Sequence, residues 1–202
     1  MTKIIAISNH KGGVGKTTST VNIGAGVALR GKKVLLIDLD PQANLTQCLG
    51  ISDPEKTIYG ALRGEYDLPT FPVNENLYLA PSTLDLASVE IELSTKIARE
   101  TILKKMIEKV SKDFDYIFID CPPSLGLITV NAFAAADEIF IPLQAQVLAL
   151  HGLDKLTDII TLVQESLNKD LKIGGVFITQ YDSRKILNRD IAESVSNYFK
   201  GN

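Results

Sequence analysis

Short apolar runs alternate along the chain with segments of helical period, and this pattern predicts the order of the elements. Buried strands are expected at residues 4–8, 34–37, 77–80, 116–119, 139–143 and 173–179. Helices are expected at residues 16–30, 84–93, 98–110, 152–167 and 188–199. The stretch 46–76 carries six glycines and prolines and predicts short helices and loops.

Strands that are apolar throughout and alternate with helices indicate a parallel sheet covered on both faces. We therefore expect an α/β fold of three layers, with a twisted, mostly parallel central sheet flanked by helices. The 202 residues, 45% of them hydrophobic, suit a single domain over 1–202, without an internal repeat or an interdomain linker.

Charge and cysteine content narrow the function classes. The net charge of −3 argues against a constitutive nucleic-acid coat, so any such binding needs a local basic patch. Cys48 and Cys121 lie far apart without metal-ligand spacing, as in proteins of a reducing compartment. No apolar stretch reaches the roughly 18–20 residues that span a bilayer, so a cytoplasmic location without membrane contact is expected.

A glycine-rich loop follows the first predicted strand and leads into a helix. Glycines let backbone N–H groups approach phosphate oxygens, and the helix N-terminus favours anions. Lys16 is expected to reach the β- and γ-phosphates of ATP, and the Thr17 hydroxyl to bind Mg²⁺. A tight turn alone would also explain the glycines, but the strand, the helix and the closing Lys-Thr-Thr favour a P-loop NTPase fold. The expected nucleotide contacts are Gly12, Gly13, Val14, Gly15, Lys16, Thr17 and Thr18.

Two carboxylates follow the second predicted strand, in the segment Asp38-Leu39-Asp40-Pro41-Gln42. Sites in such folds lie at the carboxyl ends of strands, so both should lie beside the glycine loop. The period of two places Asp38 and Asp40 on the same side. Either could hold Mg²⁺ through water or position an attacking water, and the alternative is a strand-end cap.

A third segment places Asp120 at the end of the apolar strand 116–119, directly before Cys121-Pro122-Pro123. A carboxylate at this place is of the Walker B kind and holds Mg²⁺ through a water. The two prolines stiffen the turn that follows.

The three segments, in this order and spacing, resemble the ParA-type (Soj-like) partition ATPases. Lys11 precedes the glycines, and the loop is similar to the deviant Walker A motif of the ParA, MinD and nitrogenase iron protein class. The resemblance implies that Lys11 reaches the phosphates of the other subunit in an ATP-bound homodimer, as an arginine finger does. It implies that Asp40 orients the hydrolytic water, so Lys11, Lys16 and Asp40 are the expected catalytic residues. It assigns Mg²⁺ to Thr17, Asp38 and Asp120.

Partners also follow from the resemblance: non-specific DNA bound by the ATP dimer, and a ParB-like centromere-binding protein that stimulates hydrolysis. The protein would then be associated with the nucleoid of a bacterium. Arg184, Lys185 and Arg189 form a small basic cluster at a predicted helix start and are the candidate DNA-binding residues, although a solvated charged turn explains them equally well. Family members usually continue with a further strand and helix, so the chain is expected to lack the family's last strand and helix.

Two other functions stay open at this point. A MinD-like positioning ATPase would need an amphipathic C-terminal anchor, which the sequence does not contain. A nucleotide-gated binding module with little turnover would share the loop but lack hydrolysis.

Overall fold

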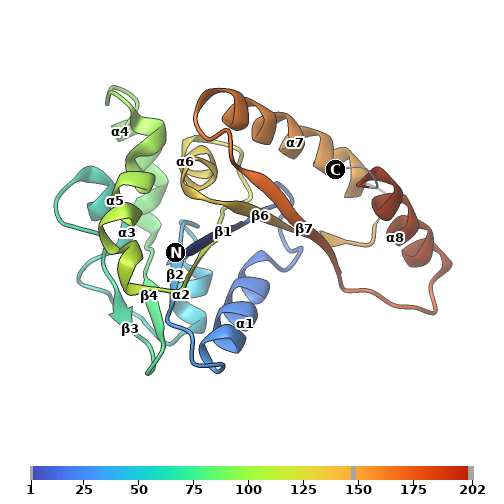
Figure 1. The fold of residues 1–202 in the computed structure, drawn as a ribbon, viewed down its shortest axis with the longest axis horizontal. Helices are drawn as coiled ribbons and strands as arrows, with labels where there is room; N and C mark the ends of the chain where they lie inside the picture. The colour runs from blue at the N-terminus through green and yellow to red at the C-terminus, as the bar shows by residue number, and fades with distance from the viewer. Residues whose placement is uncertain (1, 147–148, 200–202) are drawn as a thin grey trace.

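The apolar runs of the sequence form the strands of one sheet in the computed structural model, which describes residues 2–146 and 149–199 (Figure 1). The strands are β1 (Lys3–Ile7), β2 (Val34–Asp38), β3 (Phe71–Pro72), β4 (Leu77–Ala80), β5 (Tyr116–Asp120), β6 (Glu138–Gln144) and β7 (Lys172–Thr179). Their order is β3-β4-β2-β5-β1-β6-β7. Neighbours are parallel except β3, which pairs antiparallel with β4. The expected mostly parallel sheet is confirmed.

Helices lie on both faces of this sheet (Figure 1). They are α1 (Lys16–Ala28), α2 (Asn44–Cys48), α3 (Ile58–Arg63), α4 (Val89–Glu92), α5 (Ile102–Val110), α6 (Leu127–Ala135), α7 (Ala149–Ser166) and α8 (Ile186–Tyr198). Short 3₁₀ helices cover Leu84–Ser88 (η1), Arg99–Thr101 (η2) and Ser111–Asp113 (η3). Within the described ranges, none of the helices has the length and apolar character that crossing a bilayer requires.

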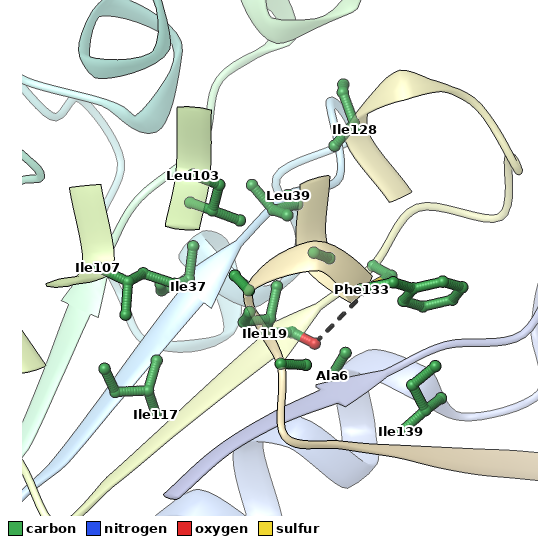
Figure 2. Packing of buried hydrophobic residues seen from close by; sticks show 14 of the residues in the cluster. Ala6, Ile37, Leu39, Leu103, Ile107, Ile117, Ile119, Ile128, Phe133 and Ile139 are labelled. Carbon is green, nitrogen blue, oxygen red and sulfur yellow. Dashed lines mark hydrogen bonds between the residues drawn. The ribbon is translucent and has the colours of Figure 1, made fainter. Parts of the chain in front are cut away.

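The sheet separates two layers of buried side chains. On strand β1, Ile5 and Ile7 point to one layer and pack with Ala28 of α1. Ala6 lies between them in sequence and points to the opposite layer, where it meets Phe133 of α6 (Figure 2). Phe133 is fully buried, which contributes about 1.5–3 kcal/mol. The three-layer arrangement therefore follows from the alternation of apolar side chains along each strand.

Two predicted helices are interrupted in the structure. The segment 84–93 consists of η1 followed by one turn of α4, and the segment 98–110 consists of η2 followed by α5. Ala98 has a φ of +55°, which no continuous right-handed helix contains, so the second helix cannot begin there. The helix predicted over 16–30 ends at Ala28, before Gly31 with a φ of +78°.

The sequence pattern missed α6 and β3. Helix α6 buries nearly all of its residues between the sheet and neighbouring helices, so it shows no alternation of apolar and polar positions. Strand β3 contains only two residues, one of them a proline at the sheet edge. Neither element leaves a periodic signal.

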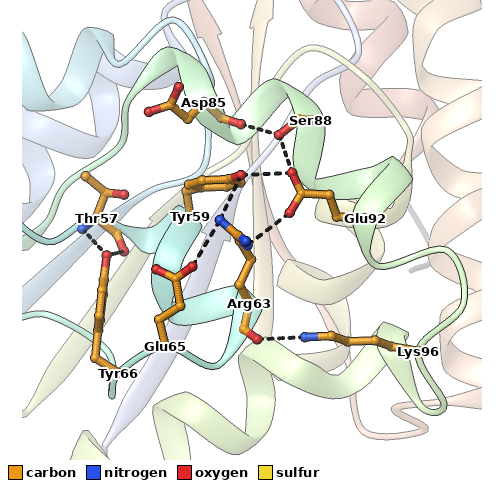
Figure 3. Close-up of polar contacts among 9 residues, drawn as sticks. All are labelled: Thr57, Tyr59, Arg63, Glu65, Tyr66, Asp85, Ser88, Glu92 and Lys96. Atoms are coloured by element: carbon orange, nitrogen blue, oxygen red, sulfur yellow. Dashed lines mark hydrogen bonds and ion pairs between the residues drawn. The ribbon is translucent and has the colours of Figure 1, made fainter.

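A polar network on the surface holds α3 against α4 (Figure 3). Arg63 forms ion pairs with Glu92 and Glu65, both at 3.0 Å, and the Tyr59 hydroxyl donates to Glu92 at 2.8 Å. Because these groups are exposed, each pair contributes little stability. The network connects α3 to α4. Glu90 of α4 in turn accepts a hydrogen bond from the Ile128 N–H at the start of α6.

A close approach of α1 to the sheet gives a test of this packing. A Cβ atom at Gly24 would lie 2.5 Å from Leu36 Cδ2, whereas a Cβ at Gly26 of the same helix meets nothing within 4 Å. Leu36 is fully buried in the layer that α1 covers. We expect Gly24→Ala to destabilise the protein by about 1–2 kcal/mol through overpacking. The matched Gly26→Ala should stabilise it by about 0.5–1 kcal/mol through helix propensity alone. Urea unfolding of both variants measures this, and equal effects would contradict the close packing of α1.

Candidate nucleotide-binding site

The loop of residues 11–18, here called the P-loop, connects β1 to α1 at the carboxyl edge of the sheet. Gly13 and Gly15 have φ angles of +72° and +91°, a region that other residues rarely adopt. Gly12 and Gly13 are exposed to solvent, whereas Val14 is buried beneath them. The glycines at these positions therefore allow the turn that the predicted phosphate contacts require.

The N-terminus of α1 is open to a ligand. Gly15 precedes the helix without any side-chain cap, so the first N–H groups of α1 have no capping partner from a side chain. Lys16, the first helical residue, is buried, and its ammonium group donates to the carbonyl of Lys11 at 3.1 Å. Burial lowers the pKa of Lys16, while the nearby Asp120 opposes that shift. The start of α1 therefore combines a cation with amides that no side chain caps, and both favour an anion.

Asp120 connects the central strand β5 to this helix. Its carboxylate accepts a hydrogen bond from Thr17 Oγ1 at 2.6 Å, and Thr20 Oγ1 lies 3.3 Å away. Thr17 and Thr20 are three residues apart in α1 and so point to the same strand end. Burial raises the pKa of Asp120 to about 7, against the hydrogen bond from Thr17 that lowers it.

Asp38 lies beside Asp120 in the register of β2 and β5, but it bonds to other partners. Its carboxylate accepts hydrogen bonds from the Thr46 N–H at 2.9 Å, from Thr46 Oγ1 at 2.7 Å and from the Asp40 N–H at 3.1 Å. Burial raises the pKa of Asp38 to about 6, and the bonds from Thr46 oppose that shift. Asp38 therefore holds the start of α2 and the following turn, and its place in a metal site stays a prediction.

Asp40 lies outside the strand, in the turn that leads into α2. Its Oδ1 atom accepts a hydrogen bond from the Gln42 N–H at 2.9 Å, and Ala43 closes the turn with a φ of +54°. The alternation expected for Asp38 and Asp40 does not apply, because β2 ends at Asp38. The two residues are instead joined directly, side chain to backbone.

Lys11 leaves the P-loop toward the connection between β6 and α7. Its ammonium group donates to the side-chain carbonyl of Gln146, and its N–H donates to Asn9 Oδ1 at 3.0 Å. Asn9 is fixed in turn by a bond to the Pro142 carbonyl at 2.8 Å. Lys11 and Lys16 therefore hold their ammonium groups on different partners, although they belong to one loop.

The donor set fits Mg²⁺ only in part. Thr17 Oγ1 and Asp120 Oδ2 are adjacent oxygens of the kind that Mg²⁺ prefers. Across the described part of the chain, no group of three or more His, Cys, Asp or Glu side chains could hold a metal ion. Phosphate oxygens and water would have to complete the coordination, as is usual for Mg²⁺ bound with a nucleotide.

The basic cluster of Arg184, Lys185 and Arg189 lies at the start of α8, and no contact between it and these carboxylates is present among the described residues. Arg184 forms a paired contact with Asp182, with both nitrogen-to-oxygen distances at 3.0 Å. Lys185 and Arg189 are exposed, and no ion pair of either is present among the residues with described positions. The structure thus brings together the P-loop, Asp38, Asp40 and Asp120, but not the basic cluster.

Several contacts of the site escaped the sequence interpretation. Thr20 and Thr46 bond the two strand-end carboxylates, and Gln146 receives Lys11. The side chains of Thr179 and Gln180, at the end of β7, bond carbonyls of the P-loop. The spacing of Thr17 and Thr20 is a signal for the first of these contacts, whereas the others join segments far apart in the chain.

Comparisons with known proteins show which sequences and folds this chain resembles. A family described as an AAA domain matches residues 2–173. The sporulation initiation inhibitor protein Soj of Bacillus subtilis is 49% identical over 99% of this chain and 81% of its own length. The chromosome-partitioning ATPase Soj of Treponema pallidum is 46% identical, over 98% of this chain and 79% of its own. A crystal structure of a Mycobacterium smegmatis protein titled cobyrinic acid a,c-diamide synthase, with a bound ATP analogue and magnesium, is 40% identical with a TM-score of 0.93. The match covers 98% of this chain and 83% of the Mycobacterium smegmatis chain.

The raised pKa of Asp120 predicts how stability depends on pH. Between about pH 4 and 7 the folded protein keeps a proton on Asp120 that the unfolded chain releases, so this group lowers stability as pH rises through that window. Asp120→Asn removes the effect. We expect the variant to gain stability relative to wild type from about pH 5 to pH 7, by at most about 1.4 kcal/mol per pH unit, and no further above pH 7.

Asp182→Asn is the matched control, measured by urea unfolding of the ligand-free protein. Arg184 lowers the pKa of the half-buried Asp182, so its contribution is lost only as pH falls through the acid range below the usual Asp value. Its difference from wild type should stay flat between about pH 5 and pH 8. A flat difference for Asp120→Asn as well would contradict the buried, proton-retaining state of Asp120.

Proposed function

Because the chain belongs to the Soj/ParA family of P-loop ATPases, we propose that it works as an ATP-dependent dimeric switch in the partition of a plasmid or chromosome. It is an ATPase that uses ATP and Mg²⁺. The observation that carries the proposal is the P-loop with two lysines, set beside the bonded pair of Thr17 and Asp120.

In this proposal the P-loop binds the phosphates through its amides and Lys16. Thr17 binds Mg²⁺ directly and Asp120 acts through a water, and both are supported by their 2.6 Å contact at the uncapped start of α1. Gly12, Gly13, Val14, Gly15 and Thr18 surround the phosphates. Asp38 acts on the metal indirectly, since its oxygens already accept bonds from Thr46 and Asp40.

Lys11 provides the link between ATP and dimerisation. In the single chain its ammonium group bonds a neutral amide, Gln146, at an exposed position. A triphosphate of a facing subunit offers this cation a far stronger partner, because charge-assisted bonds to phosphate exceed those to amides. We propose that Lys11 leaves Gln146 for the partner's phosphates and neutralises charge that develops during hydrolysis.

Asp40 is proposed to orient the attacking water. Its carboxylate is held at the turn after β2, since Oδ1 accepts the bond from Gln42 and the Asp40 N–H bonds Asp38. A fixed carboxylate near the γ-phosphate can hold water in line without itself bonding the metal.

We propose that the ATP-bound dimer binds DNA without sequence preference. Lys185, which precedes the first residue of α8, and Arg189, in the first turn of α8, are both exposed and lie close together along the chain. A dimer would carry two copies of this small basic cluster, which would strengthen phosphate binding although each chain is weakly acidic overall. A ParB-like centromere-binding protein would stimulate hydrolysis and release the DNA, so the protein would act on the nucleoid in the bacterial cytoplasm.

Two substitutions separate the steps of the proposed cycle. Asp40→Ala should keep ATP-dependent dimers but lower steady-state hydrolysis by at least about a hundredfold, because the water is no longer oriented. Gly12→Val should bind ATP as a monomer, since a side chain at this exposed position points into open space in the single chain and meets only a facing subunit. Light scattering with ATP and a phosphate-release assay measure both properties.

Lys16→Ala is the control, because losing the phosphate-binding cation should abolish ATP binding and with it both readouts. Dimers of Gly12→Val formed with ATP, or normal turnover by Asp40→Ala, would refute the assigned roles. Wild-type protein that binds ATP and dimerises without measurable turnover, with or without DNA, would favour the nucleotide-gated binding module. Binding to anionic vesicles in place of DNA would favour a MinD-like positioning ATPase.

The residues of the basic cluster differ in their ion pairs, and so they should differ in their contribution to DNA binding. Lys185→Ala and Arg189→Ala should weaken DNA binding by the ATP-bound protein and lower the slope of log K against log salt by about 0.9 for each lost phosphate contact. Arg184→Ala should change both much less, because Asp182 already neutralises that guanidinium. Filter binding across a salt series measures this, and equal effects of all three variants would contradict the distinction.

A further inference from the structure

The end of strand β7 contacts the outer side of the P-loop. Thr179 Oγ1 donates to the Val14 carbonyl at 2.7 Å, and Gln180 Nε2 donates to the Gly13 carbonyl at 3.1 Å. The Thr179 methyl group lies 3.5 Å from where a Cβ of Gly15 would stand. The last side chain of β7 and the side chain of the residue after it therefore bond two successive carbonyls of the loop.

Gln180 makes its contact from a strained backbone. Its φ is +53°, a left-handed conformation that it shares with only Ala43 and Ala98 among the non-glycine residues described. Such a conformation costs about 1–2 kcal/mol and persists where the surroundings require it. Gln144, at the end of β6, donates to Gln180 Oε1. This bond turns the other end of the amide, its NH₂ group, toward the P-loop.

Holding a carbonyl also fixes the direction of an amide. In a planar trans peptide, the C=O of one residue and the N–H of the next point in opposite directions. Bonds to the Gly13 and Val14 carbonyls therefore turn the N–H groups of Val14 and Gly15 away from β7. A P-loop binds phosphate oxygens through such backbone N–H groups.

We propose that Thr179 and Gln180 are positioning residues of the P-loop, which preorganise the Val14 and Gly15 amides for the phosphates of a nucleotide. The proposal rests on the nucleotide site of the proposed function and adds two residues that act through the loop rather than on the ligand. Glycines at positions 12, 13 and 15 make the free loop flexible, so its order has to come from outside. Preorganisation by β7 reduces the ordering entropy that the nucleotide would otherwise have to overcome.

The test compares Thr179→Val, which keeps the shape and loses the donor, with Thr179→Ser, which keeps the donor. Gln180→Met keeps the length and loses the donor, and Gln180→Gly also removes the backbone strain. Mg²⁺ with ADP is the probe, titrated by calorimetry, and thermal unfolding of the ligand-free protein is measured alongside. We expect Thr179→Val, Gln180→Met and Gln180→Gly each to weaken ADP binding by about fivefold or more, the value of one lost hydrogen bond. Thr179→Ser should bind within about twofold of wild type.

The two measurements separate positioning from a merely structural role. Gln180→Gly relieves the left-handed strain and so should fold as stably as wild type while binding ADP more weakly. ADP affinity that stays at the wild-type value in Thr179→Val and Gln180→Met would overturn the proposal. So would affinity that falls in Thr179→Ser as far as in Thr179→Val. ADP binding needs neither dimers nor DNA, so these outcomes are independent of whether the partition switch itself is correct.

Discussion

The hydrogen bond between Thr17 and Asp120 is the contact on which the arrangement of the site depends. It joins the first turn of α1 to the end of β5, the strand that lies between β1 and β2 in the sheet. Because Asp120 is fully buried, its carboxylate would be costly to keep without such partners. The same oxygens that anchor the helix in the single chain are those a magnesium ion would use, so fold and chemistry share one group.

The second carboxylate of the sheet edge has a different part. The carboxylate oxygens of Asp38 accept hydrogen bonds from Thr46 and Asp40. These bonds fix the turn that carries Asp40, the proposed water-orienting residue. Burial raises the pKa of both carboxylates, Asp38 raises that of Asp120 further, and the hydrogen-bond partners of each limit the shift. The two carboxylates therefore have different roles because their partners differ. Asp120 faces α1, the helix after the P-loop, and Asp38 faces the loop after β2.

Local sequence predicted the order of the main strands and the place of the P-loop, because both depend on short-range patterns. Buried runs mark strands, and Gly13 and Gly15 supply the positive φ angles of the loop. It failed where burial removed the pattern, as in α6, or where a residue in left-handed conformation interrupts a helix, as at Ala98. The partners of the loop were beyond its reach, because Gln146 and Thr179 are distant in the chain and meet the loop only through the order of the strands.

Strand order also determines when the site comes into existence. The P-loop is among the first segments to be synthesised, but its contacts with Asp120 and Thr179 span 103 and 165 residues. At about 5–20 residues per second, a ribosome needs on the order of ten seconds or more to supply β7 after the loop has been made. In the earlier part of that interval β1 also lacks its neighbours in the sheet, because β5 and β6 end only at Asp120 and Gln144. A nascent chain therefore completes the contacts of its P-loop only after β7 has been made, and a bound nucleotide then stabilises only chains whose sheet is already assembled.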